Sequence, residues 1–207
     1  MTERAKASKL VYLPVTSFVQ NVASRAPVPG GGSVAALSAS LGASLQVMVC
    51  RISSTRMGEE ARPYFEEVER EAMGLRDDLR TLVDADSDAY EEVIAAAKSA
   101  DSTAVAQAAR KAAEVPLKTA ELARRAMDLL EELARKAYPG AVTDVGVAAV
   151  MLQGAVVGAR YNVLVNVPSV GDETFALEAS RRLDQWRREA ADIAAAVAGI
   201  VESRMDA

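Results

Sequence analysis

Two helix-length segments that are apolar or small on nearly every side constrain the fold of this chain most strongly. Residues 33–54 and 143–165 consist largely of Ala, Val, Leu, Ser and Gly and carry very few charges. Such segments are expected to be helices inside a bundle, because a helix that faces water keeps a polar side. With three Phe, five Tyr and one Trp in 207 residues, small aliphatic side chains must supply most of the packing.

Further helices are predicted from the periodicity of apolar residues and from Pro and Gly at the segment ends. They span residues 17–25, 63–98, 102–137 and 172–202. The third of these is expected to kink near Pro116, because proline removes a backbone hydrogen bond. The sequence therefore predicts an all-α fold: one domain over residues 1–207, an antiparallel bundle of about six helices with two buried apolar central helices.

Charge and hydropathy indicate which partners to expect. Two fully apolar helices have more apolar surface than the outer helices can bury. The remainder predicts burial across a subunit interface, in a homodimer or a higher oligomer. The net charge of −5, with scattered Lys and Arg, disfavours a nucleic-acid partner. Residues 34–50 are fewer than the roughly 20 that cross a bilayer. Residues 1–14 lack the apolar core of a secretory signal, so we expect a cytoplasmic protein with no membrane partner.

The absence of histidine restricts the chemistry that the chain can perform. Histidine is the usual proton shuttle near neutral pH and the commonest transition-metal ligand, and the sequence has none. Acid–base chemistry must then use carboxylates, Lys, Tyr or the single cysteine. That cysteine, Cys50, falls in an apolar stretch and is interpreted as a small core residue.

Helical periodicity singles out Asp86 as a candidate catalytic carboxylate. It falls on the apolar stripe of the 63–98 segment, whereas Asp84 and Asp88 fall off the stripe and are expected to be solvated. The stripe comprises Leu75, Leu79, Leu82, Val83, Tyr90, Val93, Ile94 and Ala97. Burial would raise the pKa of Asp86 and suit it to general acid–base catalysis. The structural alternative is a buried aspartate that pairs with an arginine or caps a neighbouring helix.

A glycine-rich turn, Pro29-Gly30-Gly31-Gly32-Ser33, leads into the first apolar helix. Its free amides and the positive end of the helix dipole can hold an anion such as a carboxylate. It is not a phosphate-loop signature, because no Gly-Lys-Ser/Thr follows it and no strand precedes it. The alternative is that the glycines allow the preceding helix to pack closely and that Ser33 is a plain N-cap.

Two asparagines stand out in the second apolar segment. Asn162 and Asn166 are four residues apart and share a helix face, and each can donate and accept hydrogen bonds. Such a pair suits a heterocycle with alternating donors and acceptors, although a buried interhelical hydrogen bond explains it equally well. Asp144, near the start of the same helix, is interpreted as a capping residue in preference to a ligand.

Four ordered blocks at a shared spacing together point to a family. They are Ala26-Pro27-Val28-Pro29-Gly30-Gly31-Gly32-Ser33 after Phe18-Val19, then Asp86-Ser87-Asp88-Ala89-Tyr90, then Val115-Pro116-Leu117, and finally Asp144-Val145-Gly146-Val147-Ala148 continuing to Asn162-Val163-Leu164-Val165-Asn166. Nearly end to end, the chain resembles the formiminotetrahydrofolate cyclodeaminase and methenyltetrahydrofolate cyclohydrolase family. One block departs from the family pattern: where the family has a Gly-Asn-x-Asn turn, this chain has Ala137-Tyr138-Pro139-Gly140.

The resemblance implies an all-helical homodimer that binds a folate in a groove lined by the glycine turn, Asp144, Asn162 and Asn166. It also implies that Asp86 is the catalytic residue. The expected reaction converts 5-formiminotetrahydrofolate into 5,10-methenyltetrahydrofolate and ammonia, with no metal and no redox cofactor. The alternatives are a methenyltetrahydrofolate cyclohydrolase and a non-catalytic folate-binding helical module. A separate formiminotransferase is the expected protein partner.

Overall fold

The two apolar segments form α3 (Gly31–Arg56) and α7 (Val142–Asn166), which pack against each other in antiparallel orientation in this computed structural model. The structure describes residues 9–99 and 101–206. Gly42 lets the two helices approach closely, because a Cβ there would lie only 2.9 Å from the Leu152 side chain. The hydroxyl of Ser38 adds a hydrogen bond of 3.1 Å to the Met151 carbonyl.

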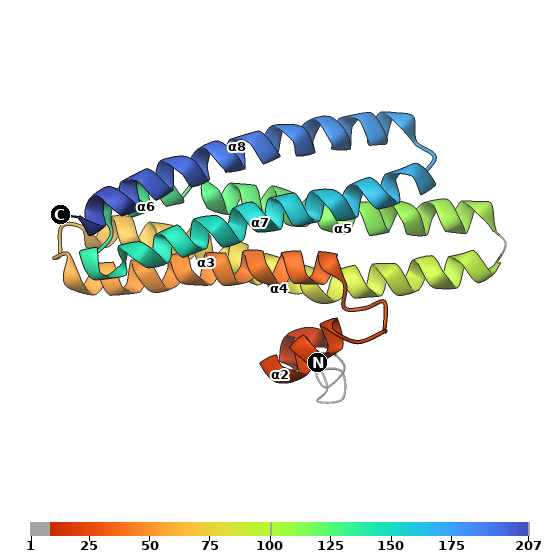
Figure 1. The fold of residues 1–207 in the computed structure, drawn as a ribbon, viewed down its shortest axis with the longest axis horizontal. Coiled ribbons are helices and arrows are strands. Elements are labelled where there is room, and N and C mark those ends of the chain that lie inside the picture. The colour runs from red at the N-terminus through yellow and green to blue at the C-terminus, as the bar shows by residue number, and fades with distance from the viewer. Residues whose placement is uncertain (1–8, 100, 207) are drawn as a thin grey trace.

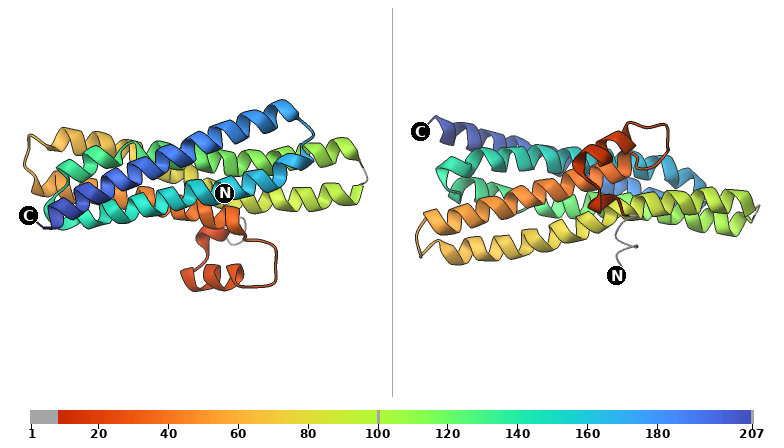
Figure 2. Two further views of the ribbon diagram at one scale, coloured as in Figure 1. Left: turned by 45° about the horizontal axis from the view of Figure 1, so that its top comes forward. Right: turned by 90° about the horizontal axis from the view of Figure 1, so that it is seen from below.

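The outer helices surround this pair on three sides (Figure 1). Helix α4 (Arg62–Ser99) packs along α3, and α5 (Ser102–Met127) packs against both α4 and α7. Helix α8 (Glu173–Met205) crosses over α7 and also contacts α5 and α6 (Figure 2). The described residues contain no strand, and the predicted all-α antiparallel bundle is confirmed.

Each predicted helix is present, but the predicted 102–137 helix is divided into two. Helix α5 continues through Pro116 and ends at Met127, and α6 (Leu130–Lys136) follows after a tight turn. At this turn the buried Gln46 of α3 donates its Nε2 to the Ala126 carbonyl at 2.6 Å. The same carbonyl accepts from the Leu129 amide at 3.4 Å, three residues on, so the backbone tightens here and a contact between distant residues stabilises the break.

The N-terminal part of the described chain lies outside the bundle. It comprises the 3₁₀ turn η1 (Leu10–Tyr12) and the short helix α2 (Val15–Val22), which projects from the bundle beside α3 (Figures 1 and 2). The Leu10 amide donates to Asp84 Oδ1 at 2.6 Å and anchors η1 on α4. The prediction that Asp84 is solvated is therefore wrong, because Asp84 is buried as the acceptor of this bond, whereas Asp88 is exposed as predicted.

One side of the central pair remains open to solvent in the single chain. Val34, Leu41 and Met48 recur every seven residues on α3 and are exposed. Exposed apolar side chains of α7 accompany them: Val147, Val150, Tyr161 and Val165. We call these seven residues the α3/α7 stripe. By length and composition alone α3 and the segment Pro139–Ser169 would suffice to cross a membrane, a test that core helices of soluble bundles also pass.

Two further 3₁₀ turns complete the connections. The first, η2 (Pro139–Ala141), leads into α7, and the second, η3 (Val167–Ser169), follows it. The Tyr138 amide donates to Ser53 Oγ at 2.9 Å, which fixes the α6–α7 connection against the C-terminal end of α3. The start of α3 and the start of α7 therefore lie at opposite ends of the bundle.

Candidate active site

The carboxylate of Asp86 lies against the first turn of α3, where Gly32 provides the space for it. A Cβ on Gly32 would be 1.9 Å from Asp86 Oδ1, a separation that no real atom could adopt. The glycine turn therefore brings the backbone of α3 and a side chain of α4 into direct contact, although they are far apart in the sequence. Asp86 thus supplies the anion that the helix N-terminus attracts.

Asp86 is held by Ser33. The Ser33 amide donates to Asp86 Oδ2 at 2.8 Å and the Ser33 hydroxyl donates to the same oxygen at 3.0 Å. The Ser33 hydroxyl also lies 3.1 Å from the hydroxyl of Ser87, the neighbour of Asp86 on α4. The alternative in which Ser33 is a plain N-cap does not hold, because Gly30 is the N-cap of α3 and Asp86 of another helix accepts from the Ser33 amide. The capping alternative for Asp86 is thus what the structure shows.

Opposing influences act on the pKa of Asp86. Burial raises this pKa above its ordinary value, as predicted, and the two hydrogen bonds from Ser33 offset part of the rise because they stabilise the charged form. Among the described residues, no hydrogen-bond donor contacts the second carboxylate oxygen, Oδ1. Ser33 therefore fixes one oxygen by hydrogen bonds, while the other packs against Gly32 and keeps its hydrogen-bonding capacity.

A cleft of about 310 Å³ opens beside Asp86 and contains most of the predicted site. Its lining comes from the glycine turn, α4, α5 and α7: Pro27, Val28, Gly30, Gly31, Asp86, Tyr90, Ala112, Asn162, Val165 and Asn166. Pro29 is buried beneath the turn, and Gly32 and Ser33 contact Asp86 from behind. The structure thus brings together eight of the nine predicted residues.

The two asparagines lie across the cleft from the glycine turn. A Cβ on Gly31 would be 3.3 Å from Asn162 Nδ2, so glycine at this position keeps the asparagine close. Asn162 donates to the Gly158 carbonyl at 2.9 Å, and Asn166 donates to the Asn162 carbonyl at 2.8 Å and to the Ala112 carbonyl of α5 at 3.1 Å. The interhelical hydrogen bond that was the structural alternative for this pair is present, and both side chains also face the cleft.

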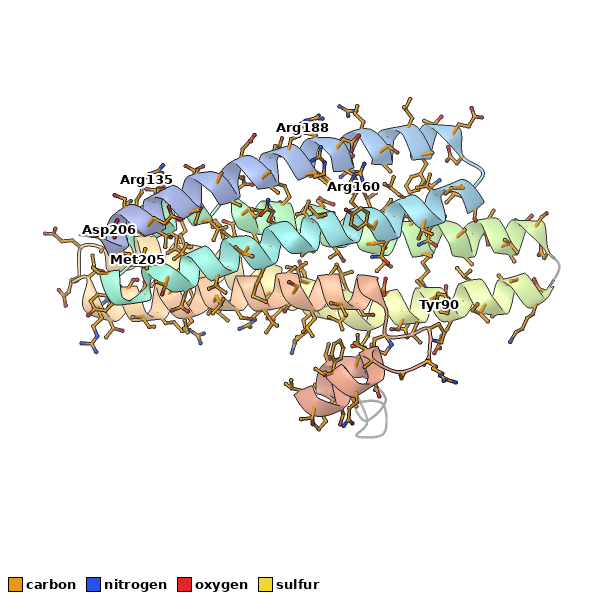
Figure 3. All side chains as sticks on the ribbon, viewed as in Figure 1. Tyr90, Arg135, Arg160, Arg188, Met205 and Asp206 are labelled. Atoms are coloured by element: carbon orange, nitrogen blue, oxygen red, sulfur yellow. The ribbon has the colours of Figure 1, made fainter. Side chains whose placement is uncertain are left out.

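Tyr90 and the residues before the glycine turn extend the cleft. Tyr90 lies one helical turn after Asp86 on α4, beside the loop that leads into α3 (Figure 3). A second hollow of about 370 Å³ shares Pro27, Val28 and Tyr90 with the cleft and reaches Lys98. The predicted apolar stripe of α4 is buried at Leu75, Leu79 and Val83, whereas Leu82 and the members after Val83 are partly or fully exposed. Sequence reasoning treated Tyr90 as a core residue, although its spacing of four from Asp86 placed it on the same face.

Asp144 is the one predicted site residue that the structure places far from the cleft. It lies in the first turn of α7, about 27 Å along that helix from Asn162. Its predicted capping role is also wrong, because the N-cap of α7 is Ala141 and makes no side-chain cap bond. The turn at 137–140 lies at the same end of the bundle, so the departure from the family pattern there leaves the cleft of this chain unaltered.

Cys50 is confirmed as a core residue. It is fully buried on α3, and burial raises the pKa of its thiol to about 12. A thiol with such a pKa stays protonated near neutral pH and is a poor nucleophile. Within the described chain, no three Cys, Asp or Glu side chains are grouped to hold a metal ion. Asp86 is the one carboxylate among the residues that line the cleft.

Comparisons with known proteins agree with this geometry. The family model described as formiminotransferase-cyclodeaminase matches residues 14–185. Formimidoyltransferase-cyclodeaminase of Gallus gallus is 35% identical over 205 residues, which cover 94% of this chain and 38% of that protein. The chain therefore spans well under half the length of this relative.

Two shorter proteins match over almost their whole length. Methenyltetrahydrofolate cyclohydrolase of Methylorubrum extorquens is 29% identical over 202 residues, which cover 93% of this chain and 97% of that protein. The crystal structure of formiminotetrahydrofolate cyclodeaminase from Thermotoga maritima has a TM-score of 0.86 and 26% identity, and the match covers 92% of this chain and 96% of that one. With the glycine turn, Asp86 and both asparagines inside the matched region, the chain belongs to the formiminotransferase-cyclodeaminase family.

Proposed function

We propose that the chain is a formiminotetrahydrofolate cyclodeaminase, which converts 5-formiminotetrahydrofolate into 5,10-methenyltetrahydrofolate and ammonia. The observation that carries the proposal is the state of Asp86: a carboxylate in a cleft, with a raised pKa and one unpartnered oxygen. A raised pKa lets a carboxylate both accept and return a proton near neutral pH. The names of the relatives support a folate as the substrate class.

The reaction needs one group that moves a proton between two nitrogens. N10 of the folate attacks the carbon of the protonated formimino group on N5, and a bond forms between N10 and that carbon. Asp86 Oδ1 accepts the proton that N10 loses. Asp86 then returns this proton to the exocyclic nitrogen, the bond between carbon and that nitrogen breaks, and ammonia leaves as the methenyl cation forms. No metal and no redox cofactor takes part in these steps, and we propose that the chain uses none.

The shape of the site accommodates a folate in one orientation. We place the pterin in the cleft that the glycine turn and the asparagines line together, with its one-carbon unit at Asp86. The p-aminobenzoyl ring then follows the shared wall of Pro27, Val28 and Tyr90 into the second hollow. At the far end of this hollow, the ammonium group of Lys98 is suited to the carboxylates of the glutamate tail.

A methenyltetrahydrofolate cyclohydrolase is the second candidate. It is favoured by the Methylorubrum extorquens relative, which carries that name and matches along 97% of its length. In that reaction water adds to the methenyl carbon and Asp86 accepts one proton from the water. Asp86 returns this proton to N5 as the bond between carbon and N5 breaks, and the hydroxyl group loses its remaining proton to solvent as the carbonyl of 10-formyltetrahydrofolate forms. The same carboxylate serves both reactions because each adds a nucleophile to the same carbon.

We also propose that two copies of the chain form a homodimer through the α3/α7 stripe. The stripe is apolar, and it is exposed on the two helices that the sequence predicts to be buried. The stripe draws on two helices that pack against each other, so an identical stripe on a second copy would cover apolar side chains of both. A cytoplasmic location and a separate formiminotransferase that supplies the substrate complete the proposal, since the relatives' names join the two activities.

Absorbance spectroscopy distinguishes the candidates. Purified protein is mixed with 5-formiminotetrahydrofolate, and the near-ultraviolet band of the methenyl product is followed together with ammonia release. In a second reaction, loss of supplied methenyltetrahydrofolate is followed. Formation of the band with one ammonia per product supports the cyclodeaminase, and accelerated loss alone supports the cyclohydrolase. Rates equal to the uncatalysed rates in both reactions would leave the non-catalytic folate-binding module.

A further inference from the structure

A carbonyl group of α5 has no backbone partner at the point where this helix borders the cleft. Residue 116 is a proline inside α5, so it offers no N–H to the carbonyl four residues earlier, which belongs to Ala112. Ala112 is buried and lines the cleft. A buried carbonyl without a donor is unfavourable, so this group requires a donor from elsewhere.

Asn166 supplies that donor. Its Nδ2 donates to the Ala112 carbonyl at 3.1 Å and to the Asn162 carbonyl at 2.8 Å. Both acceptors are carbonyl oxygens. If the carboxamide were rotated by half a turn, its Oδ1 would face these two oxygens and no hydrogen bond could form. These contacts determine which end of the carboxamide is nitrogen and which is oxygen.

We propose that Pro116 is a positioning residue that makes Asn166 a hydrogen-bond acceptor in the cleft. Both Nδ2 hydrogens are used within the protein, so the polar atom that Asn166 offers to a ligand is Oδ1. The site then recognises a ligand edge that presents N–H donors. This inference rests on the proposed function, in which the donors are the ring N–H and amino group of the pterin pyrimidine.

The role of Pro116 follows from what another residue there would do. With alanine at 116, a backbone N–H would return to the Ala112 carbonyl and compete with Asn166 Nδ2. The carboxamide would then be held by the Asn162 carbonyl alone, so its preference for presenting Oδ1 to the cleft would weaken. Helix α5 itself would gain a backbone hydrogen bond. The substitution should therefore weaken ligand binding without lowering the stability of the fold.

The first test is the kinetics of Pro116→Ala, Asn166→Leu and the double variant. We expect Pro116→Ala to raise KM for the folate about tenfold, the value of one hydrogen bond, with kcat within about twofold and Tm not lowered. Because Pro116 acts through Asn166, the double variant should have the KM of Asn166→Leu alone. Pro63→Ala, in the first turn of α4 and remote from the cleft, is the matched control and should leave KM unchanged. Multiplicative effects of the two substitutions on KM would overturn the inference.

The second test does not depend on turnover. The sequence has three asparagines, Asn21, Asn162 and Asn166, so selective ¹⁵N-asparagine labelling yields three side-chain amide signals. Asn21 is exposed on α2 and serves as the fast-exchanging reference. We expect slow hydrogen exchange at Asn166 Nδ2 and faster exchange in Pro116→Ala. Unchanged exchange in that variant would refute the positioning role, whereas absent folate turnover with the expected exchange would refute only the proposed function.

Discussion

Substitution of Gly32 by alanine should remove activity by displacing the Asp86 carboxylate. The new Cβ would lie 1.9 Å from Asp86 Oδ1, whereas ordinary van der Waals contact begins at 3.4 Å. To reach that separation the carboxylate would have to retreat from α3, which would break its bonds of 2.8 and 3.0 Å to Ser33. Both the position of the catalytic group and the cap of α3 would be lost.

The magnitudes follow from these distances. A misplacement of about 1 Å costs a catalytic group on the order of 100-fold, so kcat should fall by at least about 100-fold. Loss of two hydrogen bonds to a partly buried carboxylate, offset by the better helix propensity of alanine, should destabilise the fold by about 2 kcal/mol. For a chain of this size that loss corresponds to a decrease in Tm of about 4–8 °C.

The assay is turnover of 5-formiminotetrahydrofolate together with thermal unfolding followed by circular dichroism. Gly74→Ala is the matched control, because Gly74 is an exposed helical glycine of α4 where an added Cβ would meet nothing within 4 Å. This control should retain full activity and gain about 0.5–1 kcal/mol of stability. Wild-type kcat in Gly32→Ala would refute the argument that Asp86 must occupy this space.

Other predictions test the charge of Asp86, the binding of the glutamate tail of the folate, and the proposed homodimer. Asp86→Asn should lose turnover. The Tm of this variant minus the Tm of the wild type should increase from pH 4 to pH 8, because the raised folded-state pKa of Asp86 gives the wild type stability below the unfolded pKa that it loses as pH rises. A difference in Tm that does not change with pH would contradict this. Lys98→Glu should raise KM about fivefold for a polyglutamylated substrate and less for the monoglutamate, measured side by side. Val150→Asp on the α3/α7 stripe should yield monomers in light scattering, whereas Leu177→Asp, exposed on α8, should not.

Local patterns predicted most of the helices because apolar periodicity is a property of each segment by itself. Residues 33–54 became Gly31–Arg56, and residues 63–98 became Arg62–Ser99. The break after Met127 was missed, because Asp128 alone is a weak helix breaker and the side chain that stabilises the break, Gln46, comes from another helix. The burial of Asp84 was missed for the same kind of reason, since its partner is the distant amide of Leu10.

The candidate site was predictable as a set of residues but not as a geometry. Periodicity placed Asp86 toward the interior, and the glycine turn indicated an anion at the start of α3. That the anion is Asp86 itself depends on the packing of α3 against α4, which no local pattern encodes. The hydrogen bond that Asn166 donates to the Ala112 carbonyl could not be predicted either, because the two residues are distant in the sequence.

A chain without histidine obtains a proton carrier here by setting two influences against each other on one carboxylate. The N-terminus of α3 and Ser33 favour the charged form, so Asp86 remains available as a base, while burial disfavours the charge and raises its pKa. In the proposed function, a folate that fills the cleft would exclude water from the Asp86 carboxylate and add to the effect of burial, while the bonds from Ser33 remain. We therefore expect substrate binding to raise the pKa of Asp86 further, the direction in which a single carboxylate becomes better able to return the proton that it has accepted.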